Sequence, residues 1–129
     1  MIIVDTNIIL RYLLNDDEEL NEKATEIIDN NDIFIPTEVI VEASYVLKKV
    51  YNVEKEKIFE AIQQLIKMDG VNFQNKETIE LAFKTYAEKN LDIVDCMLYA
   101  YSKNEKFDVE TFDKKLCKLI SEIYNENQN

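Results

Sequence analysis

Short runs of β-branched residues alternate along this chain with longer stretches that have the apolar spacing of a helix. We predict strands at residues 1–4, 33–35, 71–73 and 108–112, the first two of them buried. Alternating strands and helices are typical of βαβ units on a mostly parallel sheet. Only one glycine and one proline interrupt the chain, so long irregular loops are not expected. The predicted fold class is therefore α/β.

Seven helices are predicted between and after these strands, at residues 8–14, 17–29, 37–51, 54–68, 76–89, 92–103 and 114–124. Thr37 and Asp92 are expected to cap the helices that they begin, and Gly70 to end the helix before it. At 129 residues, the chain has the usual size of one domain. We expect a single domain over residues 1–124 and a polar, frayed tail over 125–129.

Acidic residues outnumber basic ones by 26 to 15, which gives a net charge of −11. This balance weighs against a simple nucleic-acid-binding module, because affinity for phosphate normally comes from lysine and arginine. It weighs less against a metal-dependent nuclease, because an acidic site that recruits a cation presents positive charge to phosphate. The charge therefore favours metal chemistry over simple binding.

The chain has no histidine, which excludes Ser-His-Asp and Cys-His catalysis and the usual zinc sites. Carboxylate and hydroxyl oxygens remain for catalysis, and these ligands favour Mg²⁺ or Mn²⁺. Cys96 and Cys117 form no C-x-x-C motif and are interpreted as buried, reduced thiols. No secretion signal is visible, and no apolar run approaches the roughly 18 residues of a membrane span. We expect a cytoplasmic protein.

Three acidic residues are each the only charge in an apolar stretch of nine or ten residues: Asp5, Glu42 and Asp95. A buried carboxylate without a partner costs several kcal/mol or loses its charge, and a bound cation removes that cost. Asp113 is a candidate for a different reason, since it follows the last predicted strand as Asp5 follows the first. The carboxyl ends of parallel strands share one edge, where ligands bind. One cation site would account for all of these acids.

Each acid also has a purely structural interpretation that the sequence leaves open. Asp5 and Asp113 stand where a helix N-cap is expected. Asp95 stands in the first turn of a helix, where a negative charge favours the helix dipole. Glu42 can point to solvent from a crowded helix edge.

Four segments surround these acids: VDTNIILR around Asp5, VIVEASYVL around Glu42, DCMLYA beginning at Asp95, and TFDK around Asp113. They resemble the acidic motifs of PIN-domain ribonucleases, particularly the VapC toxins of type II toxin–antitoxin pairs. The motifs occur in the family's order, and the length suits the whole chain. Cys96 is a small departure, since it stands where the family frequently has alanine.

The resemblance implies a three-layer α/β/α sandwich with a central, mostly parallel sheet. It implies that Mg²⁺ or Mn²⁺ is held by Asp5, Glu42, Asp95 and Asp113 and activates water for endonucleolytic cleavage of RNA. Thr6, Asn7 and Thr111 would be supporting polar groups. A homodimer and a cognate antitoxin that covers the acidic site are the implied partners.

Some further residues are assigned from their positions alone. Arg11, Lys114, Lys115 and Lys118 are candidate RNA contacts, with ion pairing or a solvated helix face as the alternative. Asp92 is interpreted first as a cap and second as an outer metal group. Among the four acids, Asp5 and Asp95 rank first as direct ligands and Glu42 next, while Asp113 is expected to act through water.

Three other functions remain open. A PIN-type RNA-processing nuclease without an antitoxin would carry the same acids. A Mg²⁺-binding domain that accepts a phosphoryl group also uses strand-end aspartates, although the late lysine of receiver domains has no clear equivalent here. A non-catalytic PIN module would bind RNA equally with and without metal, but it would have no need of four intact acids.

Overall fold

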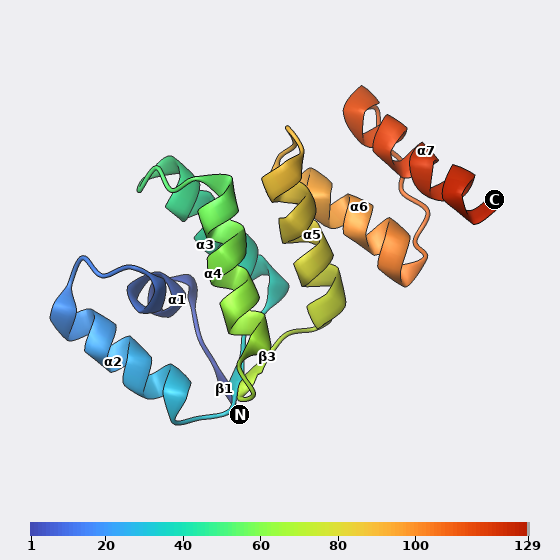
Figure 1. Ribbon diagram of the computed structural model, residues 1–129. Helices are drawn as coiled ribbons and strands as arrows, with labels where there is room; N and C mark the ends of the chain where they lie inside the picture. Colours follow the sequence, from blue (N-terminus) through green and yellow to red (C-terminus); the bar gives the residue numbers. More distant parts are fainter. Residues whose placement is uncertain (129) are drawn as a thin grey trace.

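The computed structural model describes residues 1–128, which form an α/β sandwich of three strands and seven helices (Figure 1). Strands β1 (Ile2–Ile3), β2 (Ile33–Phe34) and β3 (Val71–Asn72) form one parallel sheet in the order β1-β2-β3. Ile2 pairs with Ile33, and Ile33 pairs with Val71. The predicted α/β class and its parallel sheet are confirmed.

The seven helices lie close to their predicted ranges. They are α1 (Thr6–Leu13), α2 (Glu18–Asp29), α3 (Thr37–Lys49), α4 (Lys55–Lys67), α5 (Lys76–Glu88), α6 (Ile93–Glu105) and α7 (Lys114–Gln128). Their apolar stripes are buried as the spacing predicts, for example Ile79, Phe83 and Tyr86 on α5. Helix α7 continues to Gln128 rather than ending at Tyr124, so residues 125–128 of the predicted frayed tail are helical. Residue 129, the rest of that tail, lies outside the described residues.

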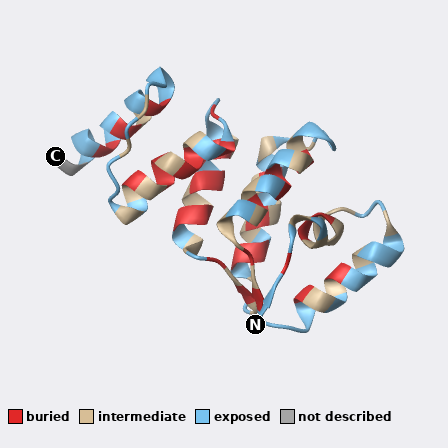
Figure 2. Cartoon of the chain, turned by 180° about the vertical axis from the view of Figure 1, so that it is seen from behind, coloured by how far each residue is buried: buried red, intermediate tan, exposed pale blue. Residues whose placement is uncertain are grey.

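The buried side chains form two separate clusters. The larger cluster fills the space between the sheet and helices α1–α6, with Phe83, Ile33 and Ile62 completely buried. Figure 2 shows these buried residues gathered on the central helices and near the strands. The smaller cluster joins α6 to α7 and consists of Tyr99, Leu116, Ile120 and Ile123. None of the described helices combines the length and the apolar character needed to span a membrane.

The predicted strand at residues 108–112 is wrong. The chain leaves α6 through Lys106, whose backbone is left-handed with a φ of 63°, and residues 107–113 lead to α7 without entering the sheet. Figure 1 places this segment and α7 at the side of the molecule away from β1. The physical reason is the smaller cluster, because burying one face of α7 against α6 draws the preceding residues away from the sheet.

The predicted strand at residues 1–4 is confirmed as β1, but its expected burial is wrong, and only Val4, just after the strand, is buried. Ile2 and Ile3 are 41% and 67% exposed, whereas Val4 is 3% exposed. Strand β1 lies at one edge of the three-stranded sheet, where only β2 pairs with it.

Two predicted helix caps and one cysteine also need correction. Thr37 is the first residue of α3, whose N-cap is Pro36, and its hydroxyl instead hydrogen-bonds to Gln74 Oε1 at 2.6 Å. Asp92 occupies the N-cap position of α6, but its side chain makes no capping hydrogen bond. Cys96 is buried as expected, whereas Cys117 is exposed because it lies on the outer face of α7.

Candidate active site

Asp5 lies directly between β1 and α1. Its Oδ1 accepts a hydrogen bond from the backbone N–H of Ile8 at 3.0 Å, so the capping interpretation of Asp5 is confirmed. The next residue, Thr6, donates its hydroxyl to Glu42 Oε2 on α3 at 3.1 Å. This hydrogen bond joins the first acidic motif, at the start of α1, to the second acidic motif, on the neighbouring helix α3. The cap fixes Asp5 through only one of its two carboxylate oxygens.

Glu42 shares a cavity of about 1110 Å³ with acids from the third and fourth motifs. Asp95 and Asp92 reach this cavity from the start of α6, and Asp113 reaches it from the start of α7. Asp5 is not among the lining residues, and Glu42 connects it to them through Thr6. Three of the four predicted acids therefore meet in one cavity, and the fourth is joined to it by a hydrogen bond.

Asp95 is the acid whose environment is most altered. It is half-buried, whereas Asp5, Glu42 and Asp113 are exposed, so the expected burial holds only in part and only for Asp95. Burial, followed by the negative charges of Asp113 and Asp92, raises the pKa of the Asp95 carboxyl above its ordinary value. Ionisation of Asp95 is therefore less favourable in the folded chain than in the unfolded chain. A cation at this point would reverse that effect.

Asp113 serves as the cap of α7. Its Oδ1 accepts from the N–H of Leu116 at 2.8 Å, and its own N–H donates to Thr111 Oγ1 at 3.1 Å. The capping interpretation is thus confirmed for Asp113 as well. Its predicted place at the edge of the sheet beside Asp5 is wrong, because the strand that would have put it there is not formed.

A compact metal cluster is not already assembled in this chain. Among residues 1–128, no three acidic side chains approach one another closely enough to hold an ion. The donors themselves fit a hard divalent cation, because they are oxygen ligands in a chain without histidine. The assignment of Asp5, Glu42, Asp95 and Asp113 as metal ligands therefore stays a prediction.

The residues predicted to support the acids or contact RNA lie in different settings. Lys114 and Lys115 line the acidic cavity, and Lys118 is exposed further along α7. Arg11 forms an ion pair with Asp16 at 3.3 Å, which is the alternative to an RNA contact that the sequence left open. Asn7 is exposed next to Thr6.

Lys55 is a cavity residue that the sequence gives no reason to single out, because it lies in a charge-mixed stretch. Its ammonium donates to the carbonyls of Lys89 and Leu91 at 3.3 and 3.1 Å and lies 4.4 Å from the centre of the Tyr86 ring. It holds the loop before α6 against α4.

Burial raises the pKa of the nearby Cys96 thiol to about 12, although Lys55 acts in the opposite direction. Cys96 is therefore inert as a nucleophile.

This combination of a parallel α/β sandwich with acids at the starts of α1, α6 and α7 and on α3 defines a class of protein. Residues 2–120 match the PIN domain, and the chain belongs to the PIN-domain family. Among curated proteins, it is similar to a VapC ribonuclease of Aquifex aeolicus (strain VF5), with 27% identity over 130 residues and 92% of each chain covered. No solved structure gives a significant match. The resemblance carried by the four sequence motifs is confirmed.

Proposed function

We propose that this chain is a divalent-metal-dependent endoribonuclease and the toxin of a toxin–antitoxin pair. The observation that carries the proposal is the meeting of Glu42, Asp95 and Asp113 at one cavity, with Asp5 linked to Glu42 through Thr6. These residues come from four separate segments of the sequence. Membership of the PIN-domain family and similarity to a relative named as a ribonuclease support it.

The four acids would hold Mg²⁺ or Mn²⁺ on the side of the cavity where Asp95 lies. A divalent cation bound there supplies an activated water and stabilises the charge on the leaving oxygen. The chain's own contribution is to orient the donors. The Ile8 amide fixes one oxygen of Asp5, and the Thr6 hydroxyl fixes one oxygen of Glu42. No protein nucleophile is needed, because water attacks the phosphodiester.

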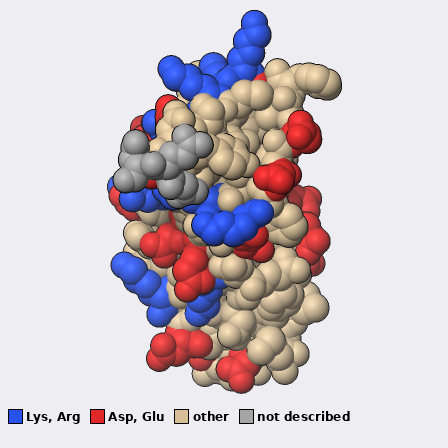
Figure 3. Space-filling model, turned by 90° about the vertical axis from the view of Figure 1, so that its right-hand side faces the viewer, with Lys and Arg blue, Asp and Glu red and all other residues tan. Residues whose placement is uncertain are grey.

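Lysines at the same cavity offer an answer to the overall negative charge. Lys48, Lys49, Lys55, Lys114 and Lys115 line it together with the acids. Figure 3 shows that basic and acidic side chains are also interspersed on the face that carries α7, rather than separated into two patches. We propose that these lysines, except Lys55, whose ammonium is held by two backbone carbonyls, contact RNA phosphates, so that a chain with a net charge of −11 can still bind its substrate.

The proposed partners follow from the same site. An antitoxin would inhibit the enzyme by covering the acidic cavity, and the active toxin would be a homodimer. Expression of the chain without its antitoxin should stop growth, and expression of an inactive variant should not. Growth arrest that persists in an inactive variant would contradict the toxin assignment.

RNA cleavage by the purified protein tests the proposal. Cleavage should require Mg²⁺ or Mn²⁺, stop with EDTA, and fall by at least about a hundredfold in Asp95→Asn. Asp69→Asn is the matched control, because Asp69 is an exposed aspartate outside the cavity and should retain full activity. Full activity of Asp95→Asn, or activity that survives EDTA, would overturn the proposal. Labelling of Asp5 by an acyl-phosphate donor without RNA cleavage would favour the phosphoryl-accepting alternative.

A further inference from the structure

One face of α3 lines the acidic cavity along most of the helix. The side chains on this face recur every three or four residues, as expected of residues that share one side of a helix. They are Glu38, Val41, Glu42, Tyr45, Lys48 and Lys49. From the start of α3 to its end, the charged groups change from carboxylates to ammonium groups, and the Tyr45 ring lies between the two kinds.

Tyr45 carries an aromatic ring that the core does not use. Its side chain is 55% exposed, and it belongs neither to the two buried clusters nor to the partly buried side chains packed against them. Tyr86, the other tyrosine of this cavity, is buried, and its ring faces the Lys55 ammonium. The Tyr45 ring has the Lys49 ammonium 5.6 Å from its centre, which favours one position of the ring. The ring is therefore available to a ligand, and the fold does not depend on it.

The position of Tyr45 along α3 places it between the proposed metal site and two lysines. Glu42 precedes it by three residues on the same face, so the two side chains are neighbours. Lys48 and Lys49 follow it by three and four residues, and within residues 1–128 neither forms an ion pair. About 10 Å along the helix axis separates Glu42 from Lys49, so a ligand that contacts both must be extended.

Single-stranded RNA has chemical groups in the same order. Its phosphates are negatively charged, and flat, uncharged bases lie between them. Proteins bind such strands by stacking bases on aromatic side chains and by holding the phosphates with basic groups. In a duplex, the bases stack on one another and cannot reach a ring on a helix surface. Val94, which is 56% exposed, adds apolar surface for a base at the cavity, directly before Asp95 on α6.

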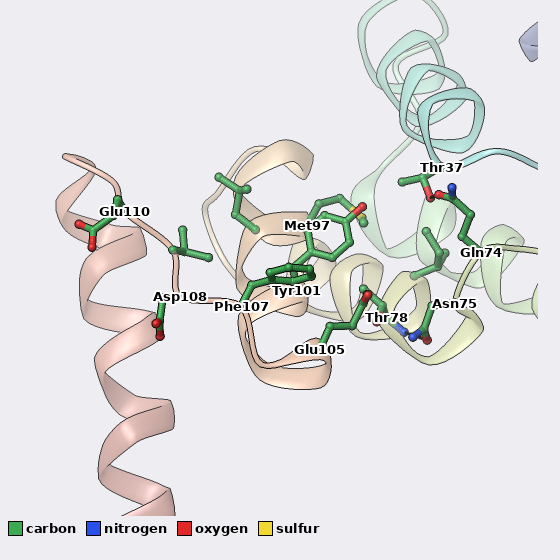
Figure 4. A pocket seen from close by; sticks show the side chains of 13 residues that line it. Thr37, Gln74, Asn75, Thr78, Met97, Tyr101, Glu105, Phe107, Asp108 and Glu110 are labelled. Atoms are coloured by element: carbon green, nitrogen blue, oxygen red, sulfur yellow. Dashed lines mark hydrogen bonds between the residues drawn. The ribbon is translucent and has the colours of Figure 1, made fainter.

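The second cavity of the molecule, of about 690 Å³, does not have this combination (Figure 4). The charged side chains that line it are all acidic: Glu105, Asp108 and Glu110. Its two aromatic rings, Tyr101 and Phe107, pack edge-on against each other with 6.2 Å between the ring centres. Among the residues that line it there is thus no cation to hold a phosphate. The comparison favours the acidic cavity as the place where an RNA strand lies.

We propose that the Tyr45 ring is the surface on which one unpaired base of a single-stranded RNA stacks, next to the phosphate that is cleaved. This inference rests on the proposed function, because the phosphate on one side of the base would lie at Glu42 and Asp95. The phosphate on the other side would lie at Lys48 and Lys49. Tyr45 then selects substrates with an unpaired base at the cleavage point and takes no part in the chemical step.

Tryptophan fluorescence tests the stacking directly. The chain has no tryptophan, so Tyr45→Trp introduces a single indole at the proposed base site. A short oligouridylate should quench its fluorescence, measured with Ca²⁺ in place of Mg²⁺ because the longer and more flexible coordination of Ca²⁺ disfavours cleavage. Tyr51→Trp is the matched control, because Tyr51 is also partly exposed, at 37%, but lies after α3 and outside the cavity. No quenching of Tyr45→Trp, or equal quenching of both variants, would overturn the proposal.

An abasic strand of the same length separates base stacking from phosphate binding. It carries the same phosphates, so it should reach the lysines but leave the fluorescence of Tyr45→Trp several-fold less quenched than the oligouridylate does. Equal quenching by the two strands would overturn the proposal, because the indole would then report the phosphates alone.

Affinity and steady-state kinetics provide a second test. Tyr45→Ala should bind the oligouridylate about ten- to a hundredfold more weakly, which is the loss expected for one stacked base. Tyr45→Leu should lose as much, since it keeps apolar bulk without a ring, whereas Tyr45→Phe should restore the affinity. In cleavage, Tyr45→Ala should raise KM and change kcat by less than about twofold. A fall in kcat at unchanged KM, or normal binding by Tyr45→Ala with an unchanged melting temperature, would overturn the proposal.

The outcomes also separate this inference from the proposed function. Quenching of Tyr45→Trp without cleavage by the unmodified protein would keep Tyr45 as a base-stacking residue and reject the nuclease. Cleavage that is unaffected by Tyr45→Ala would keep the nuclease and reject the base site. If Tyr45→Ala binds RNA normally but is no longer inhibited by a partner protein, the ring belongs to a protein interface, and the RNA assignment would be overturned.

Discussion

The body of the molecule and its C-terminal region are built in different ways. The body, residues 1–105, buries side chains from β2, β3 and six helices in one continuous core, together with Val4 just after β1. The C-terminal region, residues 106–128, has a core of only four side chains, one of which, Tyr99, belongs to α6. The body therefore has the interactions to fold as a unit. The C-terminal region is held by this small cluster and by a few further contacts, such as the edge-on packing of Phe107 against Tyr101.

Truncating the centre of the body should have the largest effect on stability. Phe83 is completely buried on α5, so Phe83→Ala should lower the free energy of unfolding by about 3–5 kcal/mol. Chemical denaturation followed by circular dichroism measures this loss. Phe112→Ala removes the same ring from a fully exposed position and should cost almost nothing. Equal losses in the two variants would contradict the assignment of the core.

Truncating the small core should have a more local effect. Leu116 is completely buried against α6, and Leu116→Ala should weaken the docking of α7 by about 2–3 kcal/mol. Because few other contacts hold α7, we expect it to detach while the body stays folded. Limited proteolysis should then cut within residues 107–113 and leave a folded fragment. Loss of the body in the same transition would show that the two regions form one cooperative unit.

The smallest expected effect concerns the charge of Asp95 in metal-free protein. Because the pKa of Asp95 is raised in the folded state, Asp95 binds its proton more tightly when the chain is folded. Its ionisation therefore lowers the free energy of unfolding. This loss begins as the pH rises through the ordinary pKa and is complete above the raised pKa. Asp95→Asn should therefore melt slightly above the unmodified protein at pH 7 and show no advantage near pH 3. Melting temperatures measured in EDTA across this range check the prediction. A variant that melts lower at pH 7 would contradict the sign of the shift.

Sequence reasoning succeeded in the body because its signals are local. Helical spacing placed α5, and the β-branched run at Ile33 placed β2, since each pattern needs only its own neighbours in the chain. It failed at 108–112, where the same β-branched pattern is compatible with a strand or with an irregular segment. The choice there depends on whether α7 packs on α6, which is a tertiary interaction that no local pattern encodes.

The candidate site shows the same division between features that local sequence signals predict and features that depend on tertiary contacts. The isolated charges at Asp5, Glu42 and Asp95 could be recognised in the sequence, and the motifs added Asp113. The hydrogen bond from Thr6 to Glu42 and the place of Lys55 at the cavity could not be predicted, because both join residues more than thirty positions from their partners. The sequence left open whether Glu42 points to solvent, and the structure shows that both Glu42 and Asp5 are exposed.

Binding of Mn²⁺ measured by titration calorimetry tests the central claim most directly, because it needs neither the RNA target nor the antitoxin. The account predicts that the unmodified protein binds the ion, that Asp95→Asn binds it at least about tenfold more weakly, and that Asp69→Asn binds it like the unmodified protein. Undiminished binding by Asp95→Asn, or no binding by the unmodified protein, would contradict the claim that these acids form a metal site.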